Sequence, residues 1–184
     1  MAFLTPISKA AQTLLLALAL CWPGERAAAQ NGAVGREYAV KAVFLLNFCQ
    51  FTTWPQTSFA SPKSPIVIGV LGADPFGNLL EEAVAGESAD GRSIRLARLR
   101  SVEEARHCHV VFVPRAAMGS ANALIQSVRG RSVLTVGEAE EFLAAGGMIS
   151  LAAESGKIRL KMNLPAVRSA ALIVSSKLLR LATR

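Results

Sequence analysis

Residues 107–109 bring together the side chains best suited to metal binding or nucleophilic catalysis: His107, Cys108 and His109. The chain contains 2 histidines, and both of them are here. In an extended segment the two histidines face one side and the cysteine faces the other, so the three side chains cannot converge on one tetrahedral ion. The same alternation separates the thiol from a base within hydrogen-bond reach, which a nucleophilic cysteine needs. We therefore expect no metal site and no catalytic pair in this segment.

Other segments have the composition of a catalytic or cofactor site but lack its spacing. The loop from Gly69 to Gly77 follows an apolar run, yet it contains neither G-x-G-x-x-G nor a glycine run ending in Lys-Ser or Lys-Thr. Ser175, Ser176 and Lys177 are adjacent and do not form the S-x-x-K of serine acyl enzymes. Adjacent glutamates fall on short helical segments, where a solvated face is the usual explanation. The sequence thus predicts a binding protein without catalytic residues or a cofactor, and not an enzyme.

Residues 1–29 have the pattern of a secretory signal peptide. Lys9 supplies the positive amino-terminal region, residues 13–22 form an apolar core, and Ala27 and Ala29 are the small residues that a signal peptidase recognises. The apolar core is about half the length of a bilayer-spanning helix, which argues against a retained anchor. We expect cleavage after Ala29, leaving residues 30–184 as a single domain in the periplasm.

Charge and cysteine content narrow the partners of this domain. The whole chain has a net charge of +7, but its basic residues occur singly and without interleaved aromatic side chains, which excludes a nucleic-acid platform. An exported basic protein instead suits anionic lipid headgroups or an acidic protein surface. Cys49 and Cys108 remain after cleavage. They either form a disulfide in the oxidising compartment or are buried separately as small apolar side chains.

The order of apolar runs and helical segments predicts an α/β fold: a three-layer sandwich with a mostly parallel sheet, an antiparallel hairpin at one edge and an apolar N-terminal helix. That helix is expected over residues 35–54. Asp74 is expected to cap a helix over residues 76–85, and Ser101 with Glu104 to form a capping box. Glu154, Ser155 and Gly156 are expected to connect the hairpin. Strands are expected at 66–71, 94–99, 109–113, 132–136, 148–153 and 157–162, and further helices at 118–128 and 138–145.

The chain contains, in this order, the segments Glu37–Phe48 with Phe51, Trp54 and Pro55, Gly69–Gly77, Gly91–Phe112, Val133–Val136, Gly146–Ile149, Asn163–Ala166, and Ile173 with Ser175–Leu179. These segments, in this order and spacing, resemble the YfiR-like family of exported bacterial proteins. The resemblance covers residues 37–182 and implies a compact α/β fold, often a homodimer, that works outside the inner membrane and has no catalytic residues. The family includes a periplasmic repressor that binds the sensor domain of a membrane-bound diguanylate cyclase.

From this resemblance we expect a periplasmic regulator that represses a membrane-bound signalling enzyme, a diguanylate cyclase, by binding its periplasmic sensor domain. Such a protein acts on cyclic-di-GMP signalling and biofilm formation. Met148→Asp is expected to release the partner without unfolding the protein. The alternative is a periplasmic small-ligand sensor with a crevice at the carboxyl ends of the strands, near Gly72, Asp74 and Thr135. The expected partner-binding residues are Val43, Phe44, Asn47, Phe48, Gly147, Met148 and Ile149.

Overall fold

The computed structural model describes residues 24–182, so most of the predicted signal peptide lies outside the described residues. The chain divides into two compact units, Met1–Gly35 and Arg36–Arg184. Helix α2 (Gly24–Phe51) begins in the first unit and ends in the second. Among the described residues, no helix combines the length and the apolar character needed to cross a membrane.

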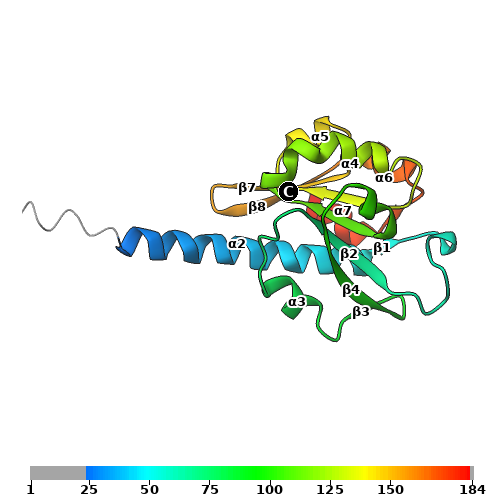
Figure 1. Ribbon diagram of the computed structural model, residues 1–184, viewed down its shortest axis with the longest axis horizontal. Helices are drawn as coiled ribbons and strands as arrows, with labels where there is room; N and C mark the ends of the chain where they lie inside the picture. The colour runs from blue at the N-terminus through cyan, green and yellow to red at the C-terminus, as the bar shows by residue number, and fades with distance from the viewer. Residues whose placement is uncertain (1–23, 183–184) are drawn as a thin grey trace, which may run out of the picture. The chain divides into compact units, whose positions relative to one another are not determined.

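The second unit is built on a curled, mostly parallel sheet (Figure 1). Its seven strands have the order β3-β4-β2-β5-β6-β7-β8. The five strands from β4 to β7 in this order are parallel, and each edge ends in an antiparallel pair. The expected mostly parallel sheet and the antiparallel hairpin β7–β8 are confirmed, whereas the antiparallel pair β3–β4 at the other edge was not expected. The strands are β2 (Ile66–Leu71), β3 (Ser88–Ala89), β4 (Arg92–Leu99), β5 (Val110–Val113), β6 (Leu134–Gly137), β7 (Ile149–Glu154) and β8 (Lys157–Met162).

Helices cover both faces of this sheet, because its central strands are apolar on both sides. Alternate residues of β5 show this: Val110 and Phe112 belong to one core cluster, and Val111 and Val113 to another. The first cluster also contains residues of α2, α3, α6 and α7, and the second contains residues of η2, α4 and α5. These elements are α3 (Leu79–Val84), α6 (Leu164–Ser169), α7 (Ser176–Ala182), η2 (Glu103–His107), α4 (Ala121–Ser127) and α5 (Glu141–Ala144).

Two predicted helix caps are wrong. Asp74 does not cap α3, which begins at Leu79, because Gly77 has a φ of +56° and interrupts the helical path. Instead, Asp74 Oδ1 accepts a hydrogen bond from the backbone N–H of Phe76 at 2.8 Å. The predicted capping box forms no α-helix either. The segment is a short 3-10 helix, and the Glu104 carboxylate accepts from the Arg100 N–H at 3.1 Å.

The turns and boundaries also differ in detail from the expectation. The β7–β8 connection is a two-residue turn in which Ser155 and Gly156 have φ of 50° and 75°, as in a type I′ turn. A second hairpin, β3–β4, turns at Asp90 and Gly91, and Asp-Gly is typical of such two-residue turns. The expected helices 118–128 and 138–145 are shorter, since the first begins as the 3-10 helix η3 (Arg115–Ser120).

After α2 the chain forms β1 (Thr52–Thr53), paired antiparallel with β9 (Ile173–Val174). The loop between β1 and β2 contains a short 3-10 helix, η1 (Gln56–Ser58).

Candidate functional site

The strand order changes direction at β2, because the chain adds β4 on one side of β2 and β5 on the other. A crevice lies at the carboxyl ends of β2 and β5. Strand β4 pairs with one edge of β2, and β5 pairs with the other. Ligands of α/β proteins bind at such switch points. The crevice has a volume of about 460 Å³. It is lined by Tyr38, Ala73, Asp74, Pro75, Pro114, Arg115, Ala116 and Glu138.

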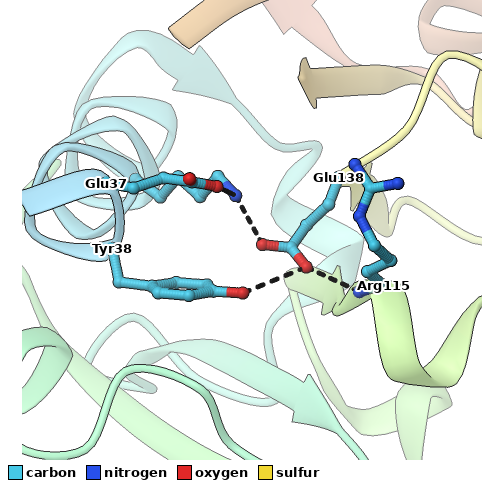
Figure 2. A network of polar contacts seen from close by, with 5 residues as sticks. Glu37, Tyr38, Arg115 and Glu138 are labelled. Carbon is cyan, nitrogen blue, oxygen red and sulfur yellow. Dashed lines mark hydrogen bonds and ion pairs between the residues drawn. The ribbon is translucent and has the colours of Figure 1, made fainter. Parts of the chain in front are cut away.

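A buried ion pair connects α2 to this end of the sheet. The side chains of Lys41 and Glu138 are each 2% exposed, and Lys41 Nζ donates to Glu138 Oε1 at 2.6 Å. Glu138 Oε2 accepts from the backbone N–H of Arg115 at 2.6 Å and from the Tyr38 hydroxyl at 3.4 Å. Glu37, one helical turn before Lys41, pairs with the same ammonium group. Figure 2 shows the Glu138 carboxylate between the α2 side chains and Arg115.

Tyr38 links this ion pair to an aromatic cluster. The Lys41 ammonium lies 4.7 Å from the centre of the Tyr38 ring. That ring packs edge to face against the Phe76 ring, with 5.4 Å between the two ring centres. Phe76 in turn contacts Phe112 of β5 at 4.9 Å. Burial, and next the nearby Glu138 carboxylate, raise the pKa of Tyr38 above its ordinary value of 10.0. The phenol therefore stays protonated and remains a hydrogen-bond donor to Glu138.

The acidic groups of the crevice are used by partners within the protein. Glu138 is paired as described, and Asp74 Oδ2 lies 3.0 Å from Arg98 Nε, which belongs to β4. No cluster of three metal-ligating side chains occurs in residues 24–182. Because α2 is apolar around most of its circumference, the burial of Lys41 selects which side of residues 36–51 faces the sheet. The ion pair therefore serves to position α2.

The residues predicted for a ligand crevice do not lie together. Asp74 lines the crevice, and Gly72 precedes it with a φ of +74°. Thr135 lies inside β6 instead, where its Oγ1 accepts from the backbone N–H of Met148 at 3.2 Å. It lines a different cavity, of about 250 Å³, next to Met148.

The predicted partner-binding residues of α2 divide between surface and core. Val43 is 53% exposed and Phe44 and Asn47 are partly buried, whereas Phe48 is fully buried. Val40 of α2 and Leu181 of α7 are also large apolar side chains, and they are 45% and 47% exposed. Together these residues form a shallow apolar groove of about 440 Å³, which we call the α2 groove. It is lined by Ala39, Val40, Val43, Phe44, Asn47 and Leu181.

The predicted partner segment Gly147–Ile149 is buried and presents no surface. Met148 is 9% exposed and Ile149 is 0% exposed. A Cβ on Gly147 would lie 2.3 Å from ring carbons of Phe142, so glycine is required for close packing.

Cys49 and Cys108 are both free and buried. They belong to different core clusters, on opposite faces of the sheet, so the structure contains two separately buried thiols and no disulfide between them. Burial raises the pKa of the Cys49 thiol to about 12 and that of the Cys108 thiol to about 11. Both thiols are therefore kept protonated and weakly reactive.

The sequence analysis missed the Lys41–Glu138 pair. The available signal was Lys41 itself, a charged residue in an otherwise apolar helix segment, which must be exposed or paired. Glu138 lies 97 residues further along the chain, and Arg115 lies 23 residues before Glu138. The sequence alone therefore does not show that these groups surround Lys41.

The fold is α/β, and its described residues contain a buried ion pair and an exposed apolar groove. The chain belongs to the YfiR/HmsC-like family (DUF4154), whose sequence profile matches residues 38–183. The expected resemblance is thereby confirmed. No curated protein matches the chain. Members of this family are periplasmic regulators of cyclic-di-GMP signalling, regulatory and not catalytic, and they act with a membrane signalling partner.

Proposed function

We propose that this protein represses a membrane-bound diguanylate cyclase by binding its periplasmic sensor domain through the α2 groove. The main support is the exposure of Val40, Val43 and Leu181, three large apolar side chains around one groove in a protein of a regulatory family. Contiguous exposed apolar surface on a folded domain marks an interaction site. We assign the partner surface to the groove instead of the segment Gly147–Ile149, because Met148 and Ile149 are only 9% and 0% exposed.

The buried ion pair supports this assignment by fixing how the groove is presented. Lys41 lies between Val40 and Val43 in the sequence, but its side chain is 2% exposed while theirs are 45% and 53% exposed. A rotation of residues 36–51 that buried these valines would expose Lys41 and leave Glu138 as an uncompensated buried charge. The groove is therefore preorganised for a partner, which reduces the ordering cost of binding. Repression follows if the inactive state of the cyclase is bound more tightly than the active state.

The experiment compares the wild-type protein with Val43→Asp and with a matched control, Ile173→Asp. Ile173 is 68% exposed and does not line the α2 groove, so both variants place a charge on an exposed apolar position. Each tagged protein is used to capture partners from detergent-solubilised inner membranes. The captured cyclase is then assayed for cyclic-di-GMP synthesis with and without added protein.

We expect wild type and Ile173→Asp to capture a membrane protein with a cytoplasmic cyclase domain and to inhibit its synthesis. Val43→Asp, folded by circular dichroism, should lose both properties. Equal capture by Val43→Asp would contradict the assignment of the groove. Conversion of a dimer to a monomer by Val43→Asp, measured by light scattering, would make the groove a self-interface and overturn the proposal.

A further inference from the structure

A second cleft lies at the opposite end of the sheet, and the proposed function does not use it. It has a volume of about 530 Å³ and is bordered by three loops that precede the neighbouring strands β2, β5 and β6. The loop before β2 contributes Ser58, the end of η2 contributes Arg106 and His107, and the turn before β6 contributes Arg131 and Ser132. None of these residues lines the α2 groove or the crevice at the carboxyl ends.

The residues lining this cleft include basic side chains and no aspartate or glutamate. Arg106, His107 and Arg131 are exposed. Within the described part of the chain, the salt bridges of arginine involve Arg98 and Arg159, and neither of these lines the cleft. Glu103 lies three residues before Arg106 on η2 but is not among the lining residues. The cleft therefore concentrates positive charge that no acidic lining residue balances, in a chain whose net charge is +7.

A side-chain hydrogen bond orients Arg106, and a turn places Arg131. Arg106 Nε donates to the backbone carbonyl of Ser127 at 3.2 Å, which orients the guanidinium and leaves its terminal nitrogens for another acceptor. Arg131 follows Gly130, whose φ of +73° creates the turn after α4. Ser58 and Ser132 line the same cleft, and serine is a neutral residue that can donate and accept hydrogen bonds.

We propose that this cleft binds a phosphate group, carried either by a small soluble molecule or by an anionic phospholipid headgroup. A guanidinium matches the oxygens of a phosphate with paired N–H donors, and hydroxyl groups complete such a site. The carboxyl-end crevice cannot take this role, because the Glu138 carboxylate and Asp74 line it. The two ends of the sheet thus differ in chemistry: one holds an internal ion pair, and the other presents arginines with no acidic lining residue.

The test uses isothermal titration with sodium pyrophosphate, and sedimentation with vesicles of phosphatidylglycerol or of phosphatidylcholine. The cleft variant is Arg106→Gln/Arg131→Gln. Its control, Arg95→Gln/Arg100→Gln, removes the same charge from two exposed arginines that do not line the cleft. The control is needed because net charge alone attracts anions.

We expect the cleft variant to bind pyrophosphate or phosphatidylglycerol vesicles about tenfold more weakly than wild type, and the control to stay within about twofold. Binding of pyrophosphate identifies a soluble phosphate ligand, and binding of phosphatidylglycerol vesicles alone identifies a headgroup. No binding of either probe, equal losses in both variants, or equal binding to phosphatidylcholine would overturn the proposal. Capture of the cyclase, measured with the same variants, should be unchanged, so failure here is distinguishable from failure of the proposed function.

Discussion

Replacement of Lys41 by methionine tests whether the buried ion pair holds α2 against the sheet. Methionine keeps most of the length of the side chain but removes the ammonium group. The Glu138 carboxylate, 2% exposed, then retains the Arg115 N–H and the Tyr38 hydroxyl as donors but no cation. Breaking a buried pair in this way costs about 3–5 kcal/mol, because it leaves an uncompensated buried charge. For a domain of this size that loss lowers the melting temperature by roughly 6–20 °C.

Urea unfolding followed by tryptophan fluorescence measures this loss. Trp54 is 5% exposed and lies 6.0 Å from the His109 ring, so unfolding changes its surroundings. Glu138→Gln in the Lys41→Met background removes the buried charge, and we expect the double variant to be more stable than Lys41→Met alone.

Lys161→Met provides the matched control on the surface. Lys161 pairs with Glu140, but their side chains are 46% and 52% exposed, and exposed ion pairs are screened by solvent. We expect little change in stability for this variant. If Lys41→Met were no more destabilising than Lys161→Met, or if adding Glu138→Gln made it worse, the argument that the pair fixes α2 would be refuted.

Two further predictions follow from buried groups. Burial lowers the pKa of His109 below its ordinary 6.5, and His109 Nδ1 accepts from the Val67 N–H at 3.1 Å. The unfolded chain therefore binds this proton more readily, and stability falls as the pH drops below about 6.5. In His109→Gln, the midpoint of urea unfolding should depend less on pH between about pH 5 and 7 than in the wild type, and His107→Gln is the control. Parallel curves of midpoint against pH for His109→Gln and the wild type would contradict this prediction. Met148→Asp should fail to fold by circular dichroism, whereas Val43→Asp stays folded, because Met148 is 9% exposed and Val43 is 53% exposed. A folded Met148→Asp protein would show that the core around β7 is misjudged.

The comparison between sequence and structure is clearest for the strands. Short apolar runs such as Ile66–Leu71 predicted buried parallel strands correctly, because a strand covered on both faces has no room for polar residues. The shorter helices were overextended, since positive-φ glycines such as Gly77 end or delay them. The Asp90-Gly91 turn was available in the sequence and would have placed the β3–β4 hairpin.

The surfaces were less predictable than the strands. An apolar residue in a helix or beside a glycine has the same composition whether it faces the core or the solvent. Val43 and Phe48 belong to the same helix and were predicted for the same role, yet one is 53% exposed and the other is 0% exposed. Gly147 was predicted to contact a partner, but the Phe142 ring leaves no room for a Cβ at this position.

The sequence by itself determined the family, the parallel sheet with its antiparallel hairpin, and the absence of recognisable catalytic spacing, because these depend on local patterns and segment order. The tertiary structure alone decided which residues meet across the chain. It paired Lys41 with Glu138, separated Cys49 from Cys108 by the thickness of the sheet, and gathered Arg106 and Arg131 from different loops into one cleft. The physical reason is that such contacts join residues distant in sequence, and their burial and charge balance arise only when the strands between them pair.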